Sequence, residues 1–163
     1  MMTQFLSLDV ADLKQQNAYW TAKEISQQPE SWCNTAAIVE NHRTEIKNFL
    51  APILALKKLQ IVLTGAGTSA YVGEALAPHL TAKTDLDVRA ISTTDIVSNP
   101  LGYLQKNTPT LLVSYARSGN SPESVAAVDL ADEVLDQCYH LVITCNEQGE
   151  LAKRANNQEN SFC

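Results

Sequence analysis

From residue 59 onward, short apolar runs alternate with helical patterns, and this alternation restricts the possible folds more than any other feature of the sequence. The apolar runs are "LQIVLT" (59–64), "DVRAI" (87–91), "TLLVSY" (110–115) and "HLVITC" (140–145). Each is rich in β-formers and is bounded by turn residues, as strands are. Strands this apolar are buried on both faces, as in parallel sheets with helical crossovers. We therefore expect a doubly wound α/β fold, a parallel sheet between two layers of helices.

Residues 1–56 contain no such runs and are expected to form an N-terminal helical extension. Its second half carries apolar residues near helical spacing, among them Ile38, Ile46, Phe49 and Ile53. Pro52 is expected to kink or end that helix. An earlier helix, 22–27, is expected to stop before Pro29. Trp20 and Trp32, on either side of it, are interpreted as anchors that pack the extension onto a core.

Composition excludes several classes of protein. The 163 residues are 45% apolar and 18% charged, which is typical of a soluble globular domain and short for two. The net charge of −6, with both signs interspersed, argues against nucleic acid as a partner. No apolar run is long enough to span a membrane, and residues 1–14 do not resemble a secretory signal. We expect a cytoplasmic protein without a membrane partner.

The cysteines and histidines show no metal-binding motif. No CxxC pair occurs among the four cysteines: Cys33, Cys138, Cys145 and Cys163. They are expected to be buried free thiols of a cytosolic protein rather than disulfides or a zinc site. No motif for a metal or a catalytic triad surrounds any of the three histidines: His42, His79 and His140.

Three polar turns follow the predicted strands. They are "TGAGTSA" (64–70), "ARSGNSPE" (116–123) and "CNEQGE" (145–150). In an open α/β sheet, ligands bind beyond the carboxyl ends of the strands, where such turns lead into helices. Adjacent strand ends would bring these turns together over one crevice.

The first turn matches a dinucleotide fingerprint only in part. The pattern G-x-G-x-x-G/A is satisfied by Gly65, Gly67 and Ala70. The nicotinamide interpretation also needs an acidic residue at the end of the next strand, but that end reads "ISTT" (91–94), and Asp85 and Asp87 lie at its start. Thr68 and Ser69 would serve equally well as helix caps. A dinucleotide-dependent oxidoreductase therefore remains an alternative with weak support.

The second turn contains more small polar residues than a helix start requires. Ser121 suits the N-cap position and Pro122 the first helical position. Ser118, Gly119 and Asn120 are left unexplained by that geometry. Outward N–H groups, hydroxyls and a helix dipole would together receive an anion such as phosphate. A turn rich in Ser, Gly and Asn is also ordinary, so the loop alone leaves both interpretations open.

Two residues at the start of this turn, Ala116 and Arg117, bear on whether it binds an anion or forms a hydrolase active site. Arg117 could clamp an anion or could simply be solvated. Ala116 stands where a nucleophile-elbow motif, G-x-S-x-G, has its first glycine, which argues against a hydrolase.

Two of these turns resemble a known family. "GAGTS" (65–69) and "SGNS" (118–121) are similar to the sugar isomerase (SIS) domain, which binds phosphorylated sugars on a flavodoxin-like sheet. "TCNEQGELA" (144–152) looks like the third loop of that domain, with Asn146 after the fourth strand. Longer blocks, such as "LTGAGTSAYVG" and "RSGNSPESVAAV", resemble the tagatose-6-phosphate ketose/aldose isomerase branch, also described as galactosamine-6-phosphate deaminase/isomerase.

The resemblance implies a set of substrate-binding residues. Those in the two turns that would hold the sugar phosphate are Gly67, Thr68, Ser69, Ser118, Gly119, Asn120 and Ser121. Ala116 replaces a serine of the family pattern, which removes one hydroxyl contact. Family members carry two SIS domains in tandem, so residues 57–163 would be the first of them. "NSFC" (160–163) looks like the opening of a fifth strand, and we expect an incomplete first domain with the second one absent.

The resemblance also implies the reaction. A base removes the proton beside the carbonyl of a hexose 6-phosphate, an enediol-like intermediate forms, and an amino substituent would leave as ammonia. No metal or organic cofactor is implied, and a homo-oligomer is expected. The glutamate and histidine of relatives would lie in the second domain. Glu74 is better explained as part of a solvated helix face, and Glu123 as a favourable charge at a helix N-terminus. The catalytic residues therefore stay unassigned, and a non-catalytic phosphosugar-sensing module is the alternative.

Overall fold

The computed structural model describes residues 4–163 and divides the chain into two compact units, residues 1–47 and 48–163. Residues 1–3 of the predicted extension lie outside the described part. The two units are treated separately below. The predicted domain boundary between residues 56 and 57 stays a prediction.

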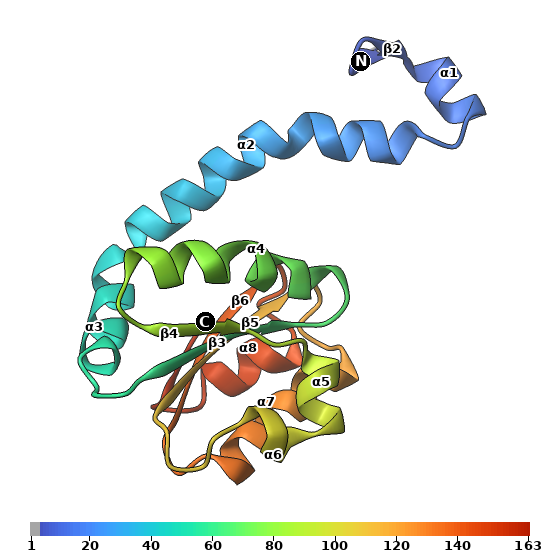
Figure 1. Cartoon of the computed structure of the whole chain (residues 1–163). Helices are drawn as coiled ribbons and strands as arrows, with labels where there is room; N and C mark the ends of the chain where they lie inside the picture. Colours follow the sequence, from blue (N-terminus) through green and yellow to red (C-terminus); the bar gives the residue numbers. More distant parts are fainter. Residues whose placement is uncertain (1–3) are drawn as a thin grey trace. The chain divides into compact units, whose positions relative to one another are not determined.

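The second unit is built on a five-stranded parallel sheet in the order β4-β3-β5-β6-β7 (Figure 1). The strands are β3 (Gln60–Gly65), β4 (Asp87–Ala90), β5 (Thr110–Ala116), β6 (Cys138–Thr144) and β7 (Ser161–Phe162). The four predicted strands are confirmed with shifts of one or two residues, and β7 confirms the predicted fifth. Because β4 lies on one side of β3 and β5 on the other, the chain reverses its winding direction between β3 and β5. The doubly wound fold is therefore confirmed.

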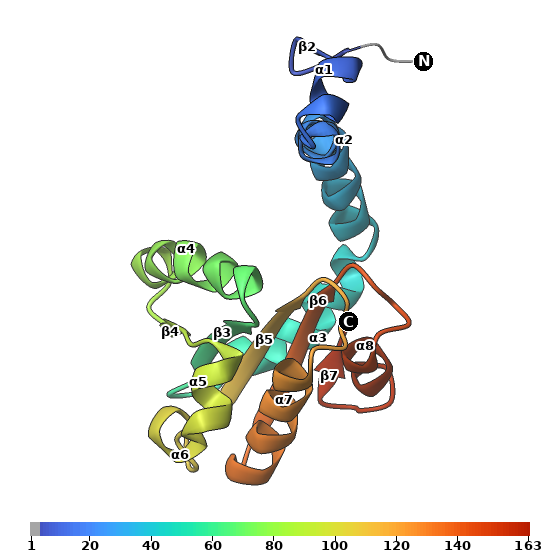
Figure 2. The same ribbon diagram turned by 90° about the vertical axis from the view of Figure 1, so that its right-hand side faces the viewer.

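Helices cover both faces of the sheet (Figures 1 and 2). One face packs on α4 (Thr68–Lys83) and on the end of α3 (Arg43–Leu54), through Ile53, Ile61, Leu63, Leu111 and Val113. The other face packs on α5 (Thr93–Ser98), α7 (Pro122–Val134) and α8 (Glu150–Ala155), through Val62, Leu112, Val142, Ala127 and Leu151. Successive strand residues alternate between the two cores, as the pleat requires. Strands buried on both faces explain the unbroken apolar runs of the sequence.

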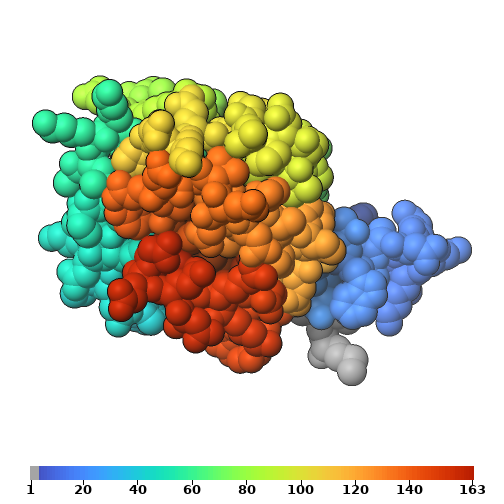
Figure 3. Space-filling model, turned by 90° about the horizontal axis from the view of Figure 1, so that it is seen from below, coloured from blue at the N-terminus to red at the C-terminus, as the bar shows by residue number. Residues whose placement is uncertain are grey.

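The outer layer of helices forms one continuous face of this unit (Figure 3). There α7 lies between α8 on one side and α5 with the short α6 (Pro100–Tyr103) on the other. The predicted start of α7 is confirmed, since Ser121 is the N-cap residue and Pro122 the first helical residue. Pro52 lies two residues before the end of α3, which agrees with the expected helix end.

The first unit contains a small hairpin and two helices. Its elements are β1 (Gln4–Phe5), β2 (Leu8–Asp9), α1 (Val10–Gln15) and α2 (Tyr19–Asn41). The expected helix end before Pro29 is wrong, because α2 continues through that residue for its full 23 residues. A proline inside a helix removes one hydrogen bond and costs about 3 kcal/mol, and the turns on both sides of Pro29 retain their own bonds.

The two tryptophans are largely exposed within the first unit, and one expectation about the cysteines is corrected. Trp20 and Trp32 are both 66% exposed, and their interpretation as anchors that pack the extension onto a core stays a prediction. Trp20 meets the edge of Tyr19 and the ammonium group of Lys23. All four cysteines are free, as expected, but only Cys138 is buried; the other three lie on α2, beyond the end of β6 and after β7. Cys138 is buried because it lies within β6, whereas Cys145 and Cys163 follow the last residues of β6 and β7 and are exposed.

Among the helices of residues 4–163, none has the length and apolar character needed to cross a bilayer.

Candidate functional site

A cavity of about 520 Å³ lies where the winding reverses, at the carboxyl ends of β3 and β5. The residues around it come from the first two polar turns and the helices that follow: Ala66, Thr68, Ser69, Val72, Tyr115, Ala116, Arg117, Ser118, Ser121 and Ser124. Four of the seven predicted substrate-binding residues therefore line one cavity, namely Thr68, Ser69, Ser118 and Ser121. Gly67, Gly119 and Asn120 lie in the same turns but outside its lining.

The first turn presents hydroxyls that the helix does not use. Gly67, not Thr68 or Ser69, is the N-cap of α4, and no side chain caps that helix end. The interpretation of Thr68 and Ser69 as plain caps is therefore wrong. Gly65 allows the turn to be tight, because a Cβ there would lie 2.7 Å from the Ser69 carbonyl carbon. Both hydroxyls thus remain available at the cavity wall, beside the positive end of the α4 dipole.

Gly67 has a backbone conformation that other residues avoid. Its φ is +54° and its ψ is −125°, while a Cβ at this position would meet no atom within 4 Å. Strain, not collision, would therefore be the effect of a side chain.

We expect Gly67→Ala to lower the free energy of unfolding by about 1–3 kcal/mol, the usual cost of holding such a residue in a disfavoured conformation. Relief of this strain would turn the peptide groups next to Thr68, so affinity for a sugar phosphate should fall as well. Urea unfolding and ligand titration measure the two effects separately. Lower stability with unchanged affinity would show that Gly67 serves only the packing of α4.

Residues 144–151, the third loop, hold the second turn in place by donating hydrogen bonds to the carbonyl oxygens of residues 116–119. Donors in residues 144–151 bond to four successive carbonyls: Cys145 N to Ala116 O (3.3 Å), Thr144 Oγ1 to Arg117 O (3.4 Å), Asn146 Nδ2 to Ser118 O (2.8 Å) and Leu151 N to Gly119 O (3.0 Å). The Asn120 side chain also faces this loop and accepts the Glu150 N–H at 2.8 Å. Asn120 and Asn146 therefore fix the loop and do not line the cavity.

This bracing determines the direction of the loop's N–H groups. In a planar trans peptide the N–H points opposite to the C=O, so carbonyls drawn toward residues 144–151 turn the following N–H groups away from them. Within residues 4–163, no protein acceptor takes the N–H of Arg117, Ser118 or Gly119. The Asn120 N–H bonds to Ser118 Oγ at 3.2 Å. Successive free N–H groups with a positive φ at Gly119 (+68°) are typical of an anion-binding concavity.

The start of α7 adds a residue that the sequence reasoning missed. Ser124 is only 3% exposed, lines the cavity and accepts a hydrogen bond from the Ser121 hydroxyl at 2.6 Å. Its signal in the sequence was its position three residues after Ser121, which places both on one side of the first helical turn. Together they hold two hydroxyls at the N-terminus of a 13-residue helix.

The charge of the cavity favours an anion. Arg117 is its one charged lining residue, and that arginine makes no ion pair within the described residues. Neither Glu74 nor Glu123 lines it. Burial raises the pKa of Tyr115, so its phenol stays protonated at neutral pH and is a hydrogen-bond donor. Two helix N-termini, one guanidinium and several hydroxyls provide donors and positive potential, but no carboxylate base.

The structure does not supply the acidic residue that the dinucleotide alternative requires. Asp87 is the first residue of β4 and therefore lies at the opposite edge of the sheet from the cavity. Its carboxylate accepts hydrogen bonds from Arg89 and Gln60, which lower its pKa. No ribose in the cavity could be held by this residue.

Comparison with known proteins identifies the fold. The model of the SIS domain matches residues 53–160, which is most of the chain. The chain belongs to the SIS domain family. D-galactosamine-6-phosphate deaminase AgaS of Shewanella sp. (strain ANA-3) is 57% identical to this SIS domain chain over 150 residues, and the protein of the same name in Escherichia coli is 49% identical over 143. These alignments cover 90% and 88% of this chain but only 39% and 37% of the relatives, so the chain spans about two fifths of their length.

Solved structures agree with this assignment. Tagatose-6-phosphate ketose/aldose isomerase from Escherichia coli superposes on the SIS domain chain with a TM-score of 0.86 at 49% identity, over 88% of this chain and 39% of that one. Glucosamine-6-phosphate deaminase from Thermotoga maritima, at 19% identity and a TM-score of 0.52 over 73% of this chain and 37% of that one, shares the fold alone.

Proposed function

We propose that the cavity between β3 and β5 binds the phosphate group of a hexose 6-phosphate. The observation that carries this is the bracing of residues 116–119 by the third loop, which leaves three successive N–H groups free to face an anion. Hydroxyls of Thr68, Ser69, Ser118 and Ser121 surround the same space. The oxygens of one phosphate group can share these donors among them.

The predicted residues then divide into two roles. Thr68, Ser69, Ser118 and Ser121 would donate to the phosphate through hydroxyls, and Gly119 through its backbone N–H. The Ser121 hydroxyl would turn its hydrogen from Ser124 Oγ to the phosphate. Gly67 and Asn120 would act indirectly, by fixing the conformation of the two turns. Arg117 would add a charged contact where Ala116 offers no hydroxyl.

The reaction of the whole protein is also a proposal, since the chain spans only part of its relatives. The names of those relatives favour ketose/aldose isomerisation of tagatose 6-phosphate or deamination of galactosamine 6-phosphate. Both begin when a base removes the proton beside a carbonyl. The phosphate contacts would hold that carbon in place, which can lower the barrier by several kcal/mol. The cavity lining contains no carboxylate or imidazole, so we place the base in a second SIS domain or another subunit of a cytoplasmic homo-oligomer.

An activity assay tests whether this chain binds the sugar phosphate but lacks the base needed for catalysis. Two proteins are compared: the purified chain, and a longer chain that is extended to the length of the relatives. Each is supplied with galactosamine 6-phosphate. Release of ammonia and formation of ketose phosphate are followed. We expect both forms to bind the sugar phosphate and only the extended form to turn it over.

Two results would contradict this proposal. Equal turnover by the shorter chain, lost in Glu74→Gln or Glu123→Gln, would show that the base is one of these glutamates. Binding without turnover by the extended form would favour a phosphosugar-sensing module, which the absence of a base from the cavity lining also supports.

A further inference from the structure

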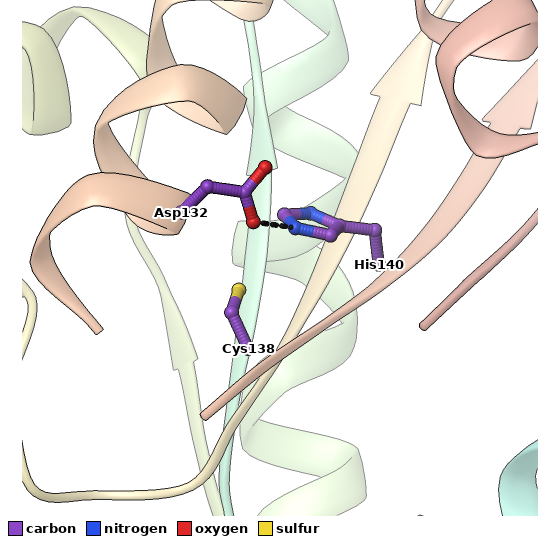
Figure 4. A group of neighbouring side chains, drawn as sticks. All are labelled: Asp132, Cys138 and His140. Atoms are coloured by element: carbon purple, nitrogen blue, oxygen red, sulfur yellow. Dashed lines mark hydrogen bonds and ion pairs between the residues drawn. The ribbon is translucent and has the colours of Figure 1, made fainter. Parts of the chain in front are cut away.

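A second cluster of polar side chains lies at the amino ends of the strands, away from the sugar-phosphate cavity (Figure 4). Cys138 and His140 are the first and third residues of β6, so their side chains project from the same face of the sheet. Asp132, near the C-terminal end of α7, faces them. One possible ligand atom from each of the three residues lies within 4.8 Å of the other two.

The hydrogen bonds of this cluster are incomplete. The side chain of His140 is only 2% exposed, and its Nε2 lies 2.7 Å from Asp132 Oδ1. Its Nδ1 is buried and has no hydrogen-bond partner in residues 4–163. The Nε2 atom faces the carboxylate and is therefore the imidazole nitrogen that could ligate an ion in this cluster, while Nδ1 would not contact that ion.

The charges of the cluster would be balanced by a cation. A divalent ion bound between the three side chains would displace the thiol proton of Cys138, and its two charges would compensate the thiolate and the carboxylate of Asp132.

The types of ligand select the kind of ion. Thiolate sulfur, imidazole nitrogen and carboxylate oxygen are the ligands of Zn²⁺ in proteins, whereas Ca²⁺ and Mg²⁺ prefer oxygen alone. A cavity of about 370 Å³ is lined by Asp132 and Cys138, so an ion and a water molecule can reach them. We propose that Asp132, Cys138 and His140 form a binding site for a zinc-type divalent cation, with a fourth position open to water.

The three ligand atoms must rearrange for the ion to enter. Two N or O ligands of one tetrahedral zinc ion lie roughly 3.3 Å apart, so the Asp132–His140 pair would open by about half an ångström. The Cys138 sulfur, which lies within 4.8 Å of both partners, would have to stand at roughly 3.5 Å from each. Asp132 can move this far, because its side chain is 36% exposed while His140 is held in the sheet. The bound ion would tie the end of α7 to β6. Because the phosphate cavity lies at the other ends of these strands, the ion would contribute to stability and would not touch the sugar.

Cobalt(II) is the probe for this site, because a thiolate ligand gives it a charge-transfer band in the near ultraviolet and tetrahedral geometry gives it strong visible bands. The purified chain, freed of metal by dialysis against a chelator, is titrated with cobalt(II) and then with zinc as competitor. We expect one equivalent to bind with both sets of bands and zinc to displace it. Asp132→Asn and Cys138→Ser should each lose at least about tenfold in affinity, since removal of even a neighbour of a metal ligand costs that much.

Matched variants locate the ion. Asp136→Asn changes a carboxylate that lines the same cavity outside the cluster, and a Cys145→Ser/Cys163→Ser variant removes the other thiols of the second unit. Both should bind cobalt(II) like the parent, and circular dichroism checks that every variant is folded. The proposal is overturned if no charge-transfer band forms, because the cluster is then only a hydrogen-bonded pair beside a thiol. It is also overturned if the band survives Cys138→Ser and disappears in the double cysteine variant.

Discussion

Replacing Ser118 and Ser121 together with alanine is expected to abolish the stabilisation of this protein by galactosamine 6-phosphate. Each hydroxyl would donate to a charged phosphate oxygen, and hydrogen bonds to charged groups contribute about 1.5–3 kcal/mol apiece. Loss of both therefore predicts a decrease in affinity of about a hundredfold or more. The ligand-induced shift of the melting temperature measures it. The variant should fold, because Ser118 is exposed and Ser121 makes no capping bond to the α7 backbone.

Two controls separate phosphate binding from a general effect. Galactosamine without phosphate should stabilise neither the parent nor the variant. Ser98→Ala changes a serine at the end of α5 that is not among the cavity residues, and it should retain the full ligand response. An unchanged melting shift in the double variant would show that the phosphate lies elsewhere.

Gly149→Ala is expected to damage the site from outside the cavity. A Cβ on Gly149 would lie 2.6 Å from the Ser118 carbonyl oxygen and 3.0 Å from Gly119 Cα, both of them backbone atoms. The second and third loops would have to separate, which would break the bonds that orient the N–H groups of residues 117–119. We expect a loss of about 1–3 kcal/mol in the free energy of unfolding, typical of overpacking, and at least about a tenfold loss in sugar-phosphate affinity.

The mechanism differs from that of Gly67→Ala, and a neighbouring residue provides the control. Gly149 has an ordinary φ of −68°, so its substitution acts through collision, whereas Gly67 would act through strain. Gln148→Ala alters an exposed side chain of the same loop and should change neither stability nor affinity. Urea unfolding and calorimetric titration measure both quantities. Gly149→Ala with parental affinity would mean that the third loop does not support the anion site.

Predictions from the sequence were correct for features that depend on a few neighbouring residues. Apolar runs bounded by turn residues gave the strands, and Ser121 before Pro122 gave the start of α7, because these patterns act over a few residues. They failed where a long element overrides a local preference. Pro29 disfavours its own turn, yet the other turns of a 23-residue helix retain their bonds around it.

The sequence by itself determined the strand–helix alternation, the two serine-rich turns and, through them, the SIS family. Only the tertiary structure decided which residues act together. Residues 116–119 are separated from residues 144–151 by a whole helix and strand, so the hydrogen bonds that turn the N–H groups of residues 117–119 away from the third loop leave no local pattern. Asp132, Cys138 and His140 are close in the sequence, but their side chains meet only because the end of α7 lies beside the start of β6. Spacing along the chain reports on periodic elements, whereas a site depends on the packing that brings distant elements into contact.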